Sequence, residues 1–84
     1  MSTSKGWSEE QGRLRKELNF KNFEMAVDYI NKVAQLAEQH NHHPKIINTY
    51  NQVNLELWTH DENAITELDW KLAKAIDELD VNFE

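Results

Sequence analysis

The sequence predicts an α+β domain in which a four-stranded antiparallel sheet carries two long helices on one face, in the order β-β-α-β-β-α. Residues 13–20 alternate between apolar and polar side chains, as expected of a half-buried strand. Residues 23–40 and 65–79 instead repeat apolar side chains every three or four positions, as amphipathic helices do. Two further strand-like runs, residues 46–50 and 53–59, lie between these helices. Both helices can then bury their apolar stripes against one side of an antiparallel sheet.

The first two strands begin the predicted sheet. Residues 7–11 are expected to form a short strand that turns at Gly12 and pairs with residues 13–20. Period-two alternation places four side chains of the longer strand on one face: Leu14, Lys16, Leu18 and Phe20.

The first helix is expected to begin after Asn22, because an asparagine side chain can accept a hydrogen bond from the first helical turn. Its predicted apolar stripe comprises Phe23, Ala26, Val27, Ile30, Val33, Ala34 and Ala37. The helix should end near His40, since Pro44 cannot continue a helix and biases His43 toward an extended backbone. The histidines of this segment therefore lie on a connection from helix to strand.

Residues 46–50 and 53–59 are predicted to form a hairpin that turns at Asn51 and Gln52, because asparagine tolerates the left-handed backbone of tight turns. Alternation places Val53, Leu55 and Leu57 on the packed face. The opposite face then carries Asn54, Glu56, Trp58 and His60. His60 should point away from the packed layer or into a cleft.

The last helix is predicted to begin at Thr66-Glu67-Leu68-Asp69, which resembles a capping box with aspartate in place of the usual glutamate or glutamine. The predicted stripe that follows comprises Ile65, Leu68, Leu72, Ile76 and Leu79. Two helices on one face leave the other face of the sheet uncovered. Polar side chains or a second subunit must cover it.

Composition narrows the class of protein. The 84 residues suffice for one small core, so we expect a single domain over residues 1–84 that self-associates as a homodimer or homotetramer. The chain has no cysteine, which excludes disulfides and thiolate chemistry and predicts a reducing, cytoplasmic location. No apolar run is long enough to cross a membrane, and residues 1–5 lack the apolar segment of a signal peptide. The formal charge of -6 opposes direct binding to nucleic acid.

All four histidines fall between positions 40 and 60, and three of them lie in His40-Asn41-His42-His43. Imidazoles held in a cleft can donate and accept protons near neutral pH, so general acid-base catalysis is the natural functional hypothesis. Solvated loop histidines without a function are the plainer alternative.

A metal site built from His42, His43 and His60 with Glu38 or Asp69 is a weaker hypothesis. Adjacent histidines in an extended segment point in opposite directions, and no pair has helical ligand spacing. We therefore expect no metal site.

Several separated motifs resemble the pterin-4a-carbinolamine dehydratase family. The resemblance is carried by Glu38-Gln39-His40-Asn41-His42-His43-Pro44, Tyr50-Asn51-Gln52-Val53, Thr59-His60 and Thr66-Glu67-Leu68-Asp69-Trp70-Lys71-Leu72-Ala73. It extends upstream through Gly6-Trp7 and Phe20-Lys21-Asn22-Phe23, and so covers nearly the whole chain. The family fold that it implies agrees with the periodicity.

The resemblance implies a lyase that needs no cofactor and dehydrates 4a-hydroxytetrahydropterin. Its catalytic residues would be His42, His43 and His60. The positions expected to bind the pterin or to orient the imidazoles are Glu38, Asn41, Trp58, Thr59 and Asp69. His43 or His42 would protonate the departing hydroxyl, and the remaining histidines would bind substrate and accept the proton. If an aromatic amino acid hydroxylase makes this substrate, the physiological role would be recycling of its cofactor.

Two departures from the family pattern stand out. Asn41 occupies a position where an acid is frequent, and Ile46 a position where an aromatic is common. The N-terminal helix of longer members also has no counterpart, since about six residues precede Trp7.

The resemblance leaves two alternative functions open, because family members also serve as dimerisation partners of a transcription factor, and distant relatives act in molybdopterin metabolism.

Overall fold

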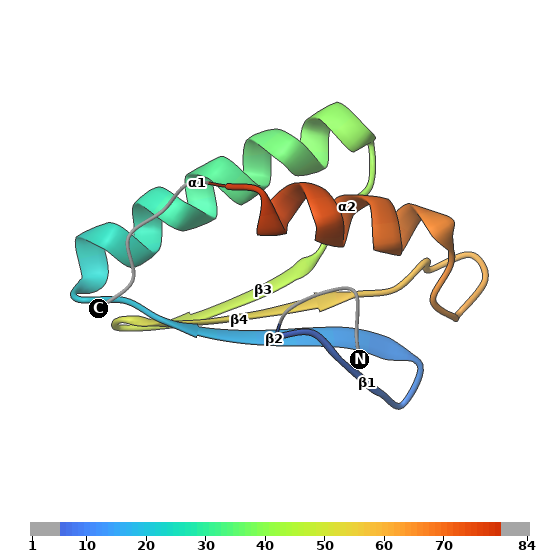
Figure 1. Ribbon diagram of the computed structural model, residues 1–84, viewed down its shortest axis with the longest axis horizontal. Coiled ribbons are helices and arrows are strands. Elements are labelled where there is room, and N and C mark those ends of the chain that lie inside the picture. The colour runs from blue at the N-terminus through green and yellow to red at the C-terminus, as the bar shows by residue number, and fades with distance from the viewer. Residues whose placement is uncertain (1–5, 80–84) are drawn as a thin grey trace.

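The computed structural model describes residues 6–79 and confirms the predicted element order (Figure 1). Its elements are β1 (Ser8–Glu10), β2 (Arg13–Asn19), α1 (Phe23–His40), β3 (Lys45–Thr49), β4 (Gln52–Leu57) and α2 (Glu67–Asp77). The strands form one antiparallel sheet in the order β1-β2-β4-β3. Residues 1–5 and 80–84, which belong to the predicted domain of residues 1–84, lie outside the described residues.

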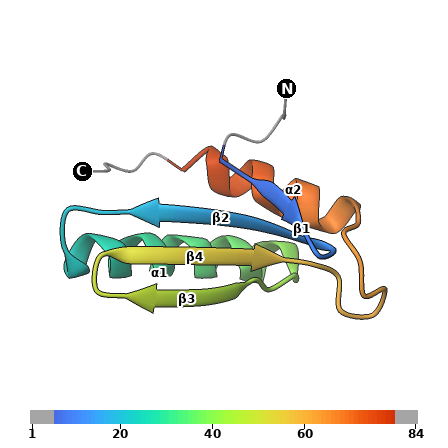
Figure 2. The ribbon, with the colours of Figure 1, turned by 90° about the horizontal axis from the view of Figure 1, so that it is seen from below.

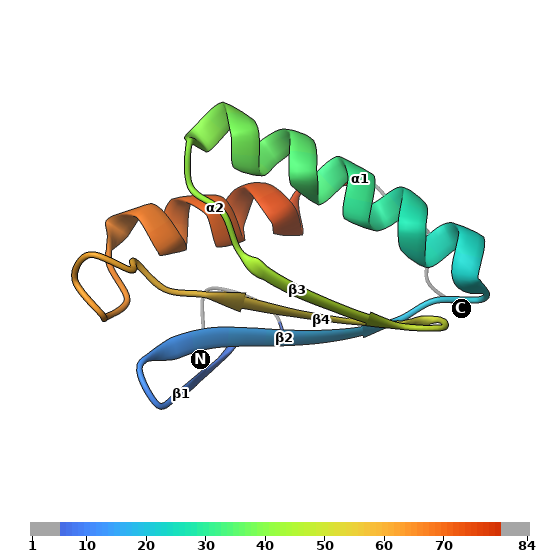
Figure 3. The same ribbon diagram turned by 180° about the vertical axis from the view of Figure 1, so that it is seen from behind.

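Both helices cover the same face of the sheet, as predicted (Figures 1 and 3). Figure 2 shows the opposite face, with the four strands side by side in front of the helices. The sheet contributes five fully or nearly fully buried side chains to the core: Leu14, Leu18, Val53, Leu55 and Leu57. Their placement confirms the predicted alternation in β2 and β4 and fixes the register, with Leu14 opposite Leu57 and Leu18 opposite Val53.

Helix α1 begins after Asn22, as predicted, and the Asn22 side chain accepts a hydrogen bond from the Met25 amide. The predicted apolar stripe is wrong in part, because the buried side chains are Ala26, Tyr29, Val33 and Ala37. Phe23 is 50% exposed at the first helical position. Ala34 is also exposed, whereas Tyr29 packs against Phe20 with ring centroids 5.0 Å apart. Burial, and secondarily the negative charge of Asp77, raises the pKa of the Tyr29 hydroxyl above its ordinary value.

Helix α2 begins with the predicted capping box. Thr66 accepts a hydrogen bond from the Leu68 amide, and Asp69 accepts one from the Thr66 amide at 2.8 Å. The prediction that Leu68 belongs to the apolar stripe is wrong, since its side chain is 46% exposed. The first turn instead buries Asp69 completely, because a residue at this capping position turns back toward the helix start.

The β3–β4 turn is displaced by one residue from its predicted position. Its two residues are Tyr50 and Asn51, and Tyr50 adopts the left-handed conformation with φ of 51°. Asn51 is hydrogen-bonded to Phe20 at the end of β2. Its side chain donates a hydrogen bond to the Phe20 carbonyl at 2.9 Å, and its own carbonyl accepts a hydrogen bond from the Phe20 amide. The turn is therefore anchored to the end of β2.

The uncovered face of the sheet carries polar side chains. Arg15 on β2 lies opposite Glu56 on β4 and also forms an ion pair with Glu10 at 2.9 Å. The contact between Arg15 and Glu10 raises the pKa of the guanidinium and lowers the pKa of the Glu10 carboxyl. Ile47 is an exposed apolar residue of this face, at 37%. In the protomer, polar side chains therefore occupy the face of the sheet that the helices leave uncovered.

Among residues 6–79 no helix is long and apolar enough to span a membrane.

Candidate active site

A cleft of about 350 Å³ lies between the end of α1, the end of β4 and the start of α2. Its lining comprises Asn41, His42, His43, Trp58, Thr59, His60, Asp61 and Leu68. The three predicted catalytic histidines therefore meet at one place, although 18 positions separate His42 from His60 in the sequence. A second hollow of about 310 Å³, under β1 on the uncovered sheet face, contains no histidine.

The end of α1 sets the direction of the first two histidines. Asn41 adopts the left-handed conformation with φ of 52°, and the His42 amide donates back to the Ala37 carbonyl at 3.1 Å. This is the hydrogen-bond pattern of a Schellman motif, in which asparagine is tolerated at the left-handed position. The chain leaves the helix sharply here, so His42 and His43 lie on the connection before β3, as predicted.

The loop between β4 and α2 presents the third histidine. Strand β4 ends at Leu57, so the prediction that this strand continues to residue 59 is wrong by two residues. Thr59 and Ala64 instead form an isolated bridge, with the Thr59 amide donating to the Ala64 carbonyl at 2.9 Å. The bridge closes the base of a short loop in which His60 is exposed at the rim of the cleft.

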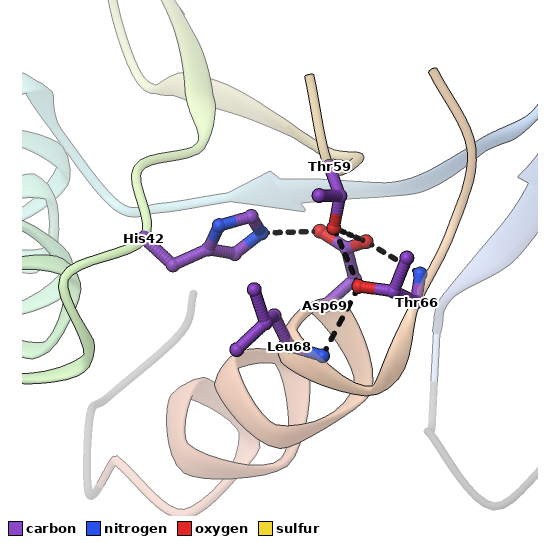
Figure 4. A network of polar contacts seen from close by, with 5 residues as sticks. All are labelled: His42, Thr59, Thr66, Leu68 and Asp69. Carbon is purple, nitrogen blue, oxygen red and sulfur yellow. Dashed lines mark hydrogen bonds and ion pairs between the residues drawn. The ribbon is translucent and has the colours of Figure 1, made fainter. Parts of the chain in front are cut away.

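His42 is paired with a buried carboxylate. Its Nε2 lies 2.5 Å from Oδ1 of Asp69, which is completely buried, while the His42 side chain is 11% exposed (Figure 4). The second oxygen of Asp69 accepts hydrogen bonds from the Thr59 hydroxyl at 2.9 Å and from the Thr66 amide at 2.8 Å. A buried carboxylate supplied with three donors is held in one orientation, and it holds the His42 ring in turn.

His43 has a carboxylate partner of a different kind. Its Nε2 lies 2.8 Å from Oε2 of Glu38, five positions earlier in the last turn of α1. Both side chains are open to solvent, at 58% and 78% exposure. Water screens such a pair strongly, so it orients the His43 ring only weakly and leaves the ring free to exchange protons with solvent.

Trp58 forms one wall of the cleft and also contacts the uncovered sheet face. The Arg13 guanidinium carbon lies 4.2 Å from the centre of the Trp58 ring. This cation-π contact occupies one face of the indole and fixes the plane of the ring. The predicted site residues Asn41 and Thr59 also line the cleft, whereas Glu38 and Asp69 adjoin it through the imidazoles that they contact.

Sequence reasoning misses two residues of this region. Leu68, expected in the core stripe, lines the cleft next to His42 in Figure 4. Thr66 is predicted only as a helix cap, yet its hydroxyl lies 2.5 Å from that of Thr59. The capping-box motif is the available signal for Thr66, whereas helical periodicity alone misassigns Leu68. Within residues 6–79, no three histidine, aspartate or glutamate side chains are grouped so as to hold a metal ion.

Comparison with known proteins decides the family. The family model described as pterin 4 alpha carbinolamine dehydratase matches residues 1–79. The chain belongs to the pterin-4a-carbinolamine dehydratase family. A provisionally named member from Sulfolobus acidocaldarius is 43% identical over 74 residues, which is 88% of this chain and 81% of that protein. Another, from Sulfurisphaera tokodaii, is 44% identical over 94% of this chain and 85% of its own length.

Solved structures agree with this family assignment. A protein of Brucella melitensis described as a transcriptional coactivator/pterin dehydratase superposes with a TM-score of 0.83 at 36% identity, covering 87% of this chain and 80% of its own. A pterin dehydratase-like protein described as a RuBisCO assembly factor in the alpha-carboxysome has a TM-score of 0.68 at 21% identity, covering 84% and 82%. The second likeness concerns the fold alone.

Proposed function

We propose that this protein dehydrates a 4a-hydroxytetrahydropterin to the quinonoid dihydropterin by histidine acid-base catalysis. The observation that carries the proposal is the convergence of His42, His43 and His60 on one cleft, with His42 held by a buried carboxylate. Membership of the family supports the choice of substrate.

The reaction requires two proton transfers. The ring nitrogen beside C4a supplies an electron pair, the bond between C4a and oxygen breaks, and a proton given to the oxygen releases water. A second group removes a proton from a ring nitrogen, so that the product is neutral. Positioned acids and bases typically accelerate such steps about 10² to 10⁴-fold.

The geometry suggests a division of labour between the histidines. A neutral His42 that donates Nε2–H to Asp69 keeps Nδ1 as an acceptor, which suits it to remove the proton from the substrate. His43, which is more exposed, suits the role of acid because solvent can return its proton after each turnover. His60 at the rim would bind the substrate or assist either transfer.

The cleft walls suit a flat heterocycle. Trp58 offers the indole face that is not covered by Arg13, and Leu68 adds an exposed apolar side chain. Asn41 and Thr59 supply polar groups at the edge of the cleft. We assign Asn41 to substrate recognition together with Glu38, and assign Asp69, which accepts a hydrogen bond from the Thr59 hydroxyl, to orientation of His42. If a pterin-dependent aromatic amino acid hydroxylase produces the substrate, the reaction returns its cofactor to the recycling pathway.

Self-association belongs to the same proposal. Strand β3 lies at the edge of the sheet, and its outer backbone groups are available to pair with another chain. A small core makes such association advantageous for stability. Light scattering should give a mass of two or four protomers, and a protomer mass at micromolar concentration would contradict it.

The test is the optically followed dehydration of 4a-hydroxytetrahydropterin, with wild type and His43→Ala, each with and without chelator. We expect wild type to exceed the uncatalysed rate, the variant to lose about 10²-fold or more, and the chelator to change neither. A wild-type rate equal to background would contradict the proposal for this substrate.

A non-catalytic binding role is the second candidate, favoured by the description of the Brucella relative as a coactivator as well as a dehydratase. A binding module has no need of three imidazoles in one cleft. Binding of a pterin analogue, measured by calorimetry, separates the two, because an adaptor without a pterin site would give no heat.

A further inference from the structure

The carboxylate of Asp69 makes three polar contacts, with His42, Thr59 and Thr66. Oδ1 faces the His42 ring, and Oδ2 accepts from the Thr59 hydroxyl and the Thr66 amide (Figure 4). It is also completely buried, although aspartate is rarely so. A helix cap alone needs only the contact with the Thr66 amide, so the other contacts require a different explanation.

The two threonine hydroxyls form a chain with a defined direction. A hydroxyl has a single hydrogen, and that of Thr59 is directed to Oδ2 of Asp69, because an ionised carboxylate can only accept. The 2.5 Å contact between Thr59 and Thr66 must therefore be donated by Thr66. Thr66 in turn accepts from the Leu68 amide at 3.3 Å. The chain runs from the backbone of α2 to Thr66, to Thr59 and to Asp69.

We propose that Thr66 and Thr59 are positioning residues that act on His42 through Asp69 and hold its ring in the tautomer with the proton on Nε2. The inference rests on the proposed function only for its effect on rate, because the tautomer of His42 is a property of the protein alone. Thr59 then contributes to catalysis through Asp69 rather than by touching the substrate.

The physical reason lies in the freedom of a carboxylate to rotate about its bond to Cβ. Two donors on Oδ2 prevent this rotation and keep Oδ1 directed at Nε2 of His42. Without the Thr59 hydroxyl, Oδ2 keeps only the amide of Thr66, and the carboxylate can turn toward it. His42 would then lose its fixed partner, and both neutral tautomers would be populated.

The experiment compares Thr59→Val, which removes the hydroxyl at nearly constant shape, with Thr59→Ser, which keeps it. Thr66→Gly removes the second hydroxyl with little loss of capping, since glycine is an acceptable N-cap. Thr49→Val, at the exposed end of β3 beside the hairpin turn, is the matched control. The readouts are the ¹⁵N shifts of His42, in the pH range where its ring is neutral, and the separate values of kcat and KM.

Wild type, Thr59→Ser and Thr49→Val should show a single tautomer protonated on Nε2. Thr59→Val should show averaged ¹⁵N shifts and a kcat about 10- to 100-fold lower, with KM nearly unchanged, as for other losses of an orienting partner. Thr66→Gly should fall between them. A Thr59→Val variant that keeps the single Nε2 tautomer would overturn the inference.

The two proposals fail in different ways. If wild type does not dehydrate the pterin, the proposed function fails, yet the ¹⁵N shifts still decide whether the threonines position His42. If Thr59→Val loses the tautomer but keeps the wild-type kcat, the assigned role in the reaction is overturned. Circular dichroism of each variant separates these outcomes from misfolding.

Discussion

Asp69→Asn changes one oxygen of the buried carboxylate to an amide nitrogen while keeping its size. In the wild type, three donors point at this group: His42 Nε2, the Thr59 hydroxyl and the Thr66 amide. An asparagine has a single acceptor oxygen, which the Thr59 hydroxyl and the Thr66 amide together would claim. The amide nitrogen would then face His42, and the ring would have to present Nε2 as an acceptor.

The predicted consequence is a reversal of the His42 tautomer, with the proton on Nδ1 at the side of the cleft. A base that offers a proton in place of a lone pair cannot remove one from the substrate. We expect kcat to fall by about 10² to 10⁴-fold, the range associated with acid-base groups and with a wrong histidine tautomer. KM should change less, because Asp69 does not line the cleft.

Stability should fall as well. Hydrogen bonds to a charged group contribute about 1.5 to 3 kcal/mol each, but the introduced asparagine would retain those from Thr59 and Thr66 in neutral form. A loss of about 2 kcal/mol in the free energy of unfolding follows, which for a domain of this size lowers Tm by about 10 °C. Thermal melts and kinetics below the lowered Tm keep the two effects apart.

Glu38→Gln is the matched control, because it makes the same chemical change beside the other paired histidine. That pair is exposed to solvent, so its loss should change stability by less than about 1 kcal/mol. The reasoning would be refuted if Asp69→Asn kept the wild-type His42 tautomer and rate, or if Glu38→Gln cost as much stability as Asp69→Asn.

Two further predictions concern the scaffold. The pKa of Tyr29 is raised in the folded state, so the stability of the wild type is intact below the unfolded pKa of about 10 and declines as pH rises past that value. Tyr29→Phe should remove up to about 1.4 kcal/mol per pH unit of this decline in the free energy of unfolding. Identical urea midpoints for both proteins across alkaline pH would contradict this prediction. Asn22→Ala removes the acceptor of the hydrogen bond from the Met25 amide and should lower the free energy of unfolding by about 1 kcal/mol in urea titrations. The value of kcat should stay unchanged. An altered kcat would show that the start of α1 is coupled to the cleft.

The sequence permitted most of the fold to be predicted where local chemistry decides the structure. Asn22 and Thr66 mark helix starts because their side chains satisfy backbone amides, and both starts are confirmed. The outward placement of Phe23 and Leu68 could not be predicted in this way. Periodicity identifies a stripe, but the way each helix packs against the sheet decides which of its members are buried.

The sequence identified the histidines that line the cleft, but neither all of the cleft's residues nor the contacts between them. The contact between His43 and Glu38 joins positions only five apart, but it depends on the left-handed turn at Asn41 that ends α1. The contact between His42 and Asp69 joins positions 27 apart, and it depends on how α2 docks beside the end of α1. The link from Thr66 to Thr59 further requires the loop that the Thr59–Ala64 bridge closes.

The central claim is that the histidines of the cleft catalyse the dehydration. The most direct measurement is the rate of 4a-hydroxytetrahydropterin dehydration by four single variants, His40→Ala, His42→Ala, His43→Ala and His60→Ala, beside wild type. His40 ends α1 outside the cleft lining and serves as the control. We predict that His40→Ala keeps the wild-type rate while the variants of the cleft histidines lose activity, most strongly at His42 and His43. Equal rates in all four variants and wild type would contradict the account.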